Sequence, residues 1–135
     1  MQDATFQLDS YHFKKASINF NIPEKATLNI DFRPSGKLLT KKSEYVLTFQ
    51  VLVNCKETAS IVVDAVCEAT FKFSSPIEKD DLPDYFYPNS LAIVYPYVRA
   101  FVSTITLQAN IRPIVLPTIN MLGFQSQLQE NTTVE

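Results

Sequence analysis

The side chains that most often carry out catalysis or bind metals are scarce in this chain of 135 residues. It has one histidine, His12, and two cysteines, Cys55 and Cys67, and their spacing does not match a zinc site with four ligands. His12 is the one histidine that could act as a base for a nucleophile, and it lies between two aromatic residues. Two isolated glycines are too few for a nucleophile elbow or a phosphate-binding loop. The sequence therefore predicts no enzymatic activity, no metal and no cofactor.

The remaining reactive side chains have simpler interpretations. Asp80 and Asp81 lie in a charged segment, where solvent-facing carboxylates are expected rather than an acid and base pair. Cys55 and Cys67 lie on neighbouring strand-like segments without a C-x-x-C pair, so we expect reduced thiols in or near the core.

The composition predicts one small domain, 1–135, that binds partners through apolar contacts. The hydrophobic fraction of 46% is enough for a core, while the net charge of −2 and the absence of a basic stripe argue against nucleic acid as a partner. We see no secretory signal at the first residues and no apolar run near the roughly 18 residues of a membrane span. The expected location is the cytoplasm, without membrane insertion.

Alternating apolar residues predict antiparallel strands over 1–73. The clearest runs are 25–33, 44–54 and 60–73, with a hairpin loop at 54–59, and the N-terminal strand changes parity at Tyr11 and Phe13. That change indicates either a bulge or a strand covered on both faces. The connection 33–43 shows no period and is expected to be a crossover loop, whose Leu38 and Leu39 either cap the core or form an apolar lip.

Helical periodicity is expected in the last third of the chain, over 95–128, after a linker at 74–94. One helix is predicted from about Pro96 to Gln108, and a shorter one from near Thr118 or Ile119. The long helix carries only one charged residue, Arg99, so we expect it to be covered on more than one side, by the sheet and by a second subunit. Residues 129–135 are expected to fray. The predicted class is α+β, with a four-stranded antiparallel sheet followed by one long and one shorter C-terminal helix.

One long stretch has a distinctive order of residues. Tyr87-Pro88-Asn89 is followed by Tyr95-Pro96-Tyr97-Val98-Arg99, then by a helix, and then by Leu116-Pro117-Thr118-Ile119-Asn120-Met121. This order resembles the C-terminal half of SecB-type export chaperones, with Met121 in place of the usual aromatic residue. The resemblance implies that both helices pack on one face of the sheet, and that the chain forms a homo-oligomer, a dimer of dimers. It also implies an ATP-independent holdase that keeps unfolded polypeptides in long apolar grooves.

The resemblance also implies positions for two kinds of site. The client-binding candidates lie around the crossover loop and near the last helix, and ordinary core packing is the alternative for each: Phe32, Leu38, Leu39, Met121, Leu122 and Phe124. The oligomer-interface candidates lie on the long helix, where Arg99 would bind a carboxylate or a carbonyl: Tyr97, Arg99, Phe101, Val102 and Ile105.

The sequence departs from that family in its first strand. The family presents acidic residues there to the SecA motor, whereas this chain has Lys14, Lys15 and Asn19, which argues against docking on a SecA-type motor. Some solitary relatives protect an antitoxin or another dedicated client. The alternative to a general holdase is therefore an oligomeric interaction protein dedicated to one partner, without general chaperone activity.

Overall fold

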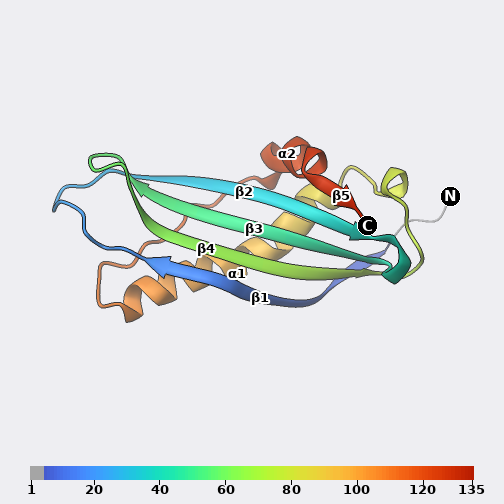
Figure 1. The fold of residues 1–135 in the computed structure, drawn as a ribbon, viewed down its shortest axis with the longest axis horizontal. Helices are drawn as coiled ribbons and strands as arrows, with labels where there is room; N and C mark the ends of the chain where they lie inside the picture. Colours follow the sequence, from blue (N-terminus) through green and yellow to red (C-terminus); the bar gives the residue numbers. More distant parts are fainter. Residues whose placement is uncertain (1–4) are drawn as a thin grey trace.

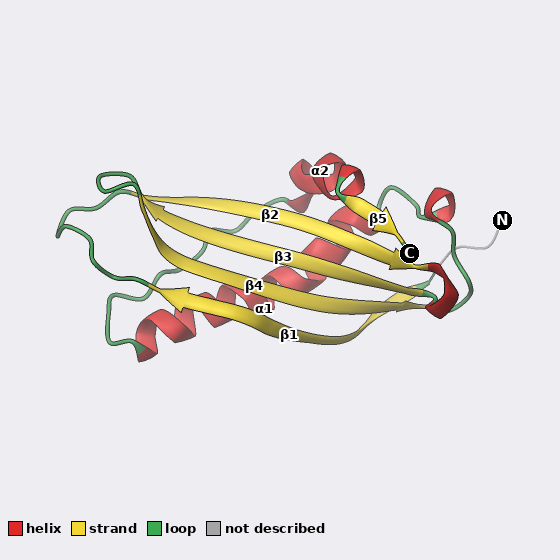
Figure 2. Ribbon diagram, viewed as in Figure 1, coloured by secondary structure: helices red, strands yellow, loops and turns green. Residues whose placement is uncertain are grey.

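A computed structural model describes residues 5–135 and places one antiparallel sheet in front of a long helix (Figures 1 and 2). The strand order is β1-β4-β3-β2-β5, and only β5 runs parallel to its neighbour. The strands are β1 (Phe6–Ile18), β2 (Leu28–Leu39), β3 (Glu44–Cys55), β4 (Ser60–Phe73) and β5 (Thr132–Val134). The helices are α1 (Phe86–Gln108) and α2 (Gln125–Glu130), with short 3-10 turns η1 (Thr40–Lys42), η2 (Lys79–Asp81) and η3 (Met121–Phe124).

The core lies between the inner face of the sheet and α1. On β3, the odd-numbered residues from Tyr45 to Val53 point inward and are fully buried or nearly so, which confirms the period of two in the sequence. Phe86 of α1 forms the aromatic centre, with its ring 4.8 Å from both the Phe6 ring and the Tyr45 ring. Cys55 and Cys67 are both buried and form no disulfide with each other, as expected for structural thiols. Burial also raises the pKa of Cys67 to about 11, so this thiol stays protonated and unreactive at neutral pH.

The N-terminal strand β1 pairs with β4 along its length, and its register shifts twice. The shifts lie between Leu8 and Ser10 and between Phe13 and Lys15. Each shift lets the strand change the face to which its side chains point. Of the two alternatives left by the parity change, the structure therefore shows the bulge.

The expected crossover loop at 33–43 is wrong, because β2 continues to Leu39 and turns through η1 into β3. The inward positions here are Phe32, Pro34, Gly36 and Leu38, so proline and glycine hid the alternation. Gly36 is required by packing, since a Cβ atom there would lie 1.8 Å from the Tyr45 hydroxyl oxygen. Pro34 is tolerated because only β3 pairs with that part of β2.

The sheet has five strands and not four, because the tail expected to fray at 129–135 contains β5. This strand pairs with Gly36–Leu38 of β2. Thr132 secures it: its Oγ1 lies 2.7 Å from the Tyr45 hydroxyl and donates a bond of 2.7 Å to the Leu128 carbonyl. Outside the sheet ladder, Glu135 Oε2 forms an ion pair of 3.1 Å with Lys37 Nζ.

The long helix begins at Phe86, well before the expected Pro96, so residues 86–94 are not a linker. Pro96 lies inside the helix, where it lacks the N–H that would bond the carbonyl four residues earlier. The early turns bury Phe86, Tyr87, Leu91 and Val94 against the sheet. The helix has a length and composition that would also suit a membrane span, although core helices share these properties.

Candidate functional site

The residues that follow α1 run back along it as an extended segment, 111–120. A row of α1 side chains, one helical turn apart, binds the backbone of this segment. Arg99 Nε donates to the Leu116 carbonyl at 2.8 Å, Ser103 Oγ donates to the Ile114 carbonyl at 3.1 Å, and Thr106 Oγ1 accepts the Ile114 N–H at 2.9 Å. One turn before Arg99, the Tyr95 hydroxyl donates to the Pro117 carbonyl. This row, called the α1 polar row below, replaces the strand partner that the segment lacks.

The side of α1 that carries the α1 polar row is covered by this chain's own extended segment, where a second subunit was expected. Ser103 and Thr106 face this chain's own extended segment, and so does Arg99, which binds a carbonyl as predicted but within the same chain. Burial raises the pKa of Tyr95, although the Arg99 charge opposes this, so the phenol stays a hydrogen-bond donor. Prolines 113 and 117 keep the segment extended.

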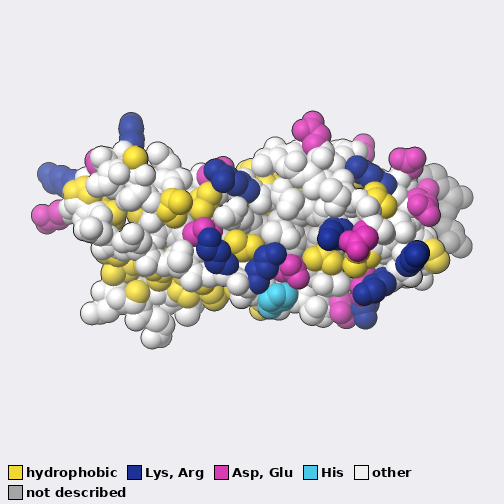
Figure 3. Space-filling view, in the orientation of Figure 1, with side chains coloured by type: hydrophobic (Ala, Val, Ile, Leu, Met, Phe, Trp, Pro, Cys, Tyr) yellow, Lys and Arg dark blue, Asp and Glu magenta, His cyan; other side chains and the backbone are white. Residues whose placement is uncertain are grey.

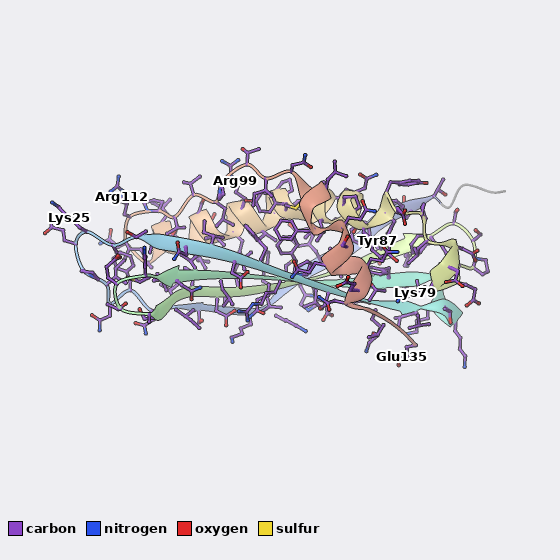
Figure 4. All side chains as sticks on the ribbon, turned by 90° about the horizontal axis from the view of Figure 1, so that it is seen from above. Lys25, Lys79, Tyr87, Arg99, Arg112 and Glu135 are labelled. Carbon is purple, nitrogen blue, oxygen red and sulfur yellow. The ribbon has the colours of Figure 1, made fainter. Side chains whose placement is uncertain are left out.

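An apolar groove of about 500 Å³ opens between this segment and the sheet. The groove lies at the end of the molecule where Figure 4 places Lys25 and Arg112. Its walls come from the β1–β2 connection, the start of β2 and the segment after α1. The lining residues are Phe20, Ile22, Pro23, Glu24, Ala26, Leu28, Ile30, Val53, Arg112, Pro113, Ile114 and Val115. Glu24 and Arg112 are the two charged residues of this lining, so an occupant meets a mostly apolar surface.

One wall of the groove also offers backbone groups. β2 pairs with β3 along its whole length, but β5 covers its other edge only at Gly36–Leu38. In the described part of the chain, no further backbone hydrogen bond joins residues 28–35 to a segment other than β3. An open strand edge beside an apolar groove is suited to an extended peptide, which could add main-chain hydrogen bonds while its side chains enter the groove.

The β1–β2 connection is fastened to the β3–β4 hairpin by Glu57. The Glu57 carboxylate accepts hydrogen bonds from the backbone N–H of Thr27, and this contact holds the Glu57 pKa below its usual value. Nearby, Lys56 N–H donates to the Thr27 carbonyl at 2.9 Å. These contacts position the wall that carries Ile22 and Ala26.

None of the predicted client-binding residues lines this groove. Leu38 is 0% exposed and belongs to the core, so its assignment to an apolar lip is wrong for this chain. Phe32 and Met121 are buried, and the Phe32 ring packs edge-on against the rings of Phe49, Tyr95 and Phe124. Leu39 and Phe124 are half-buried, and Leu122 is 63% exposed.

The predicted interface residues divide in the same way. Tyr97 is exposed and stacks on Tyr11 of β1 at a ring distance of 4.4 Å, and half-buried Phe101 stacks on Phe13 at 3.8 Å. Val102 is fully buried within this chain, so it is not available to a second subunit. The remaining two residues, Arg99 and half-buried Ile105, lie on the same helix.

The groove lining was not predicted from the sequence at either end. Phe20 and Val115 are 43% and 63% exposed, although both are apolar. A usable signal was present, because each lies in a short proline-containing apolar stretch, Phe20-Asn21-Ile22-Pro23 and Pro113-Ile114-Val115-Leu116-Pro117. Apolar residues in extended connections, outside any strand or helix period, are candidates for a binding surface.

Comparison with protein-family models gives a match over most of the chain. The family model described as "SecB: Preprotein translocase subunit SecB" matches residues 7–131. An uncharacterized protein, MJ0357 of Methanocaldococcus jannaschii, is 55% identical over 42 residues, which cover 31% of this chain and 27% of that protein. The match therefore spans about a quarter of the length of that relative.

Two solved structures share the fold. The first is the Rv1957 SecB-like chaperone of Mycobacterium tuberculosis, in complex with a ChAD peptide from the Rv1956 HigA1 antitoxin. It has a TM-score of 0.69 and 17% identity, over 84% of this chain and 87% of that one. The second is a protein of unknown function from Streptococcus agalactiae, with a TM-score of 0.53 and 13% identity, over 87% of this chain and 100% of that one. At these identities the likeness establishes the fold.

Proposed function

This chain belongs to the SecB family, and from that premise we propose that it is an ATP-independent holdase that binds unfolded polypeptide segments in its apolar groove. Proteins of this family bind client polypeptides. The observation that supports the proposal most directly is the position of the groove beside the open edge of β2. An unfolded chain offers apolar side chains together with free backbone N–H and C=O groups. The groove and the strand edge are complementary to these two features.

The construction of the groove suits clients of varied sequence. The surface of the groove is largely apolar, and apolar attraction is non-directional, so it does not select one arrangement of side chains. Main-chain hydrogen bonds to a strand edge are likewise independent of client sequence. The volume of about 500 Å³ lies within the range of pockets that enclose small ligands, which is enough for a few apolar side chains of a client. This function requires no catalytic group, and we propose that the protein is not an enzyme.

The test is a titration of the protein with a slow-folding model protein, in its unfolded and in its native form. We expect micromolar binding to the unfolded form only. Val115→Asp should weaken this binding about tenfold, or by about 1.4 kcal/mol, because it places a carboxylate against the apolar client. Val134→Asp is the matched control, since Val134 is 51% exposed and lies on β5, outside the groove. Equal effects of the two changes would contradict the groove assignment.

The backbone part of the proposal has a separate test. A client peptide that is methylated on alternate backbone nitrogens keeps its side chains but loses donors for a strand edge. We expect such a peptide to bind more weakly than its unmethylated parent. If both bind equally, the open edge of β2 is not used.

A function dedicated to one partner is the second candidate. One observation favours it: the solved SecB-like structure from Mycobacterium tuberculosis contains a peptide from an antitoxin. A dedicated protein would bind neither form of an unrelated model protein, but would bind one segment tightly. The unfolded-protein titration therefore separates the two functions.

We also propose that the protein forms homo-oligomers through α1 and the edge of β1. Four large apolar or aromatic residues have exposed side chains: Tyr11, Ile93, Tyr97 and Leu107. Within residues 5–135, β1 pairs with β4 alone and so has a partner on one side only. Covering this surface would remove it from water. Native mass measured over a dilution series tests this proposal, and a monomer at all concentrations would refute it. Family membership supports a cytoplasmic location.

A further inference from the structure

Figure 3 views the face of the sheet that points away from α1, where Lys and Arg side chains (dark blue) lie among Asp and Glu side chains (magenta). Two adjoining hollows of about 750 Å³ and 620 Å³ share the lining residues Lys14, Ser35, Thr48 and Asn131, and together they form one trough. Its floor is the outer side of β3, where small or medium side chains at Val46, Thr48 and Gln50 are half-buried. We call this feature the outer trough. It lies on the side of the sheet opposite the core-facing residues of β3.

Positive charge is concentrated along the outer trough. Six of the chain's twelve basic residues line it: Lys14, Lys15, Arg33, Lys37, Lys41 and Lys42. Among residues 5–135, the lining contains three acidic residues, Asp31, Glu68 and Glu135, and Asp64 lies beside Lys15. The trough is therefore positive although the chain as a whole carries a net charge of −2.

The two lysines of η1 are the most available of these charges. Lys14, Lys15, Arg33 and Lys37 each form an ion pair with a carboxylate of this chain. Lys41 and Lys42, in contrast, form none among residues 5–135, and both are exposed. They leave two uncompensated positive charges at one end of the trough.

The chain's own C-terminal strand brings one carboxylate to this trough from the edge of the sheet. β5 lies along β2 in an extended conformation, and the residue after it, Glu135, reaches Lys37 with an ion pair of 3.1 Å. Glu135 and Thr133 both belong to the lining of the trough. A strand-like segment can therefore bring a carboxylate to a lysine of this trough without any rearrangement of the sheet.

We propose that the outer trough binds an acidic, extended segment of a partner polypeptide. This surface is separate from the apolar groove, and no residue lines both. Nucleic acid fits less well for two reasons. The lining contains no aromatic side chain on which bases could stack, and its three carboxylates would repel a chain of phosphates.

The test uses a labelled peptide of 12 residues, the length of β2, in which glutamate alternates with serine. Its binding is followed by fluorescence anisotropy at low and at physiological ionic strength. Lys41→Gln with Lys42→Gln should weaken binding about fivefold, as expected for two exposed charge contacts. Lys25→Gln with Lys56→Gln is the matched control: it removes the same charge from two exposed lysines outside the trough, and it should change affinity less than twofold.

Four results would overturn the proposal. The first is no binding of the acidic peptide, and the second is equal loss in the two double variants, which would mean that only net charge matters. The third is equal binding of a peptide with glutamine in place of glutamate. The fourth is tighter binding of a thymidine oligonucleotide of the same length, which would make the trough a nucleic-acid site. Weaker binding at higher salt, with Val115→Asp leaving it unchanged, would support a polypeptide site independent of the groove.

Discussion

Replacing Thr106 by valine tests whether the α1 polar row holds the groove wall in place. Thr106 is fully buried, and its Oγ1 donates to the Val102 carbonyl at 2.8 Å while it accepts the N–H of Ile114 at 2.9 Å. Valine has nearly the same shape but no acceptor. The variant therefore leaves the buried N–H of Ile114 without a hydrogen-bond partner.

The expected loss of stability follows from that single donor. A buried donor left unpaired costs about 1–3 kcal/mol of unfolding free energy. The entropy of unfolding is about 2.1 cal/mol/K per residue, so the total unfolding entropy of a chain of this length is roughly 0.28 kcal/mol/K. A loss of about 2 kcal/mol should thus lower Tm by about 7 °C.

Thermal unfolding followed by circular dichroism, at one fixed protein concentration, provides the assay, because oligomers unfold at a concentration-dependent Tm. Thr104→Val is the matched control, since Thr104 is exposed on the same helix and should change stability by less than about 0.5 kcal/mol. Thr106→Ser keeps the acceptor and loses only a methyl group, which should lower the free energy of unfolding by about 0.8 kcal/mol. It should therefore be more stable than the valine variant.

The same series has a functional readout. A wall that has lost this contact should hold a client less tightly, so Thr106→Val should also weaken binding of the unfolded model protein. If Thr106→Val and Thr104→Val melt at the same temperature, the hydrogen bond to Ile114 does not stabilise the wall, and the reasoning is refuted. A serine variant less stable than the valine variant would refute it as well.

Two further predictions concern Gly36 and Glu57. Gly36→Ala should lower the free energy of unfolding by about 3 kcal/mol in denaturant titrations, because the new Cβ displaces the buried Tyr45 ring. Gly123→Ala, with no atom within 4 Å of the new Cβ, should change it by less than about 1 kcal/mol, and equal losses would contradict the packing argument. The lowered pKa of Glu57 means that its contact with Thr27 stabilises the fold above the ordinary glutamate pKa of 4.5 and is lost as the pH falls through the lowered value. The protection factor of the Thr27 amide should therefore fall on acidification but not in Glu57→Gln, and a wild-type factor that stays constant would contradict the contact.

The strand pattern and the family could be predicted from the sequence because both depend on the order of residues within short stretches of the chain. The alternation of apolar residues in 44–54 and 60–73 predicted a strand at each place, and the structure confirms both strands. The order of Pro88, Asn89, Tyr97, Arg99 and Asn120 identified the family without any contact being known.

The elements that the sequence analysis misplaced depend on partners far along the chain. The end of β2 was hidden because Pro34 and Gly36 occupy inward positions, and only the Tyr45 ring explains why glycine is needed there. β5 is held by Thr132 and by its pairing with Gly36–Leu38 of β2, which lie far earlier in the chain. Three residues of tail carry no period of their own that could have predicted this strand.

Exposure was the property that the sequence could not decide, and the candidate sites depend on it. Leu38 and Leu122 are the same kind of side chain, yet one is fully buried and the other is 63% exposed. Hydrophobicity determined that both would avoid water where a partner surface was available, but the tertiary structure alone supplies or withholds that surface. For the same reason, the basic residues of the outer trough are scattered along the sequence from Lys14 to Lys42, and only the pairing of β1, β4, β3 and β2 brings them to one face of the sheet.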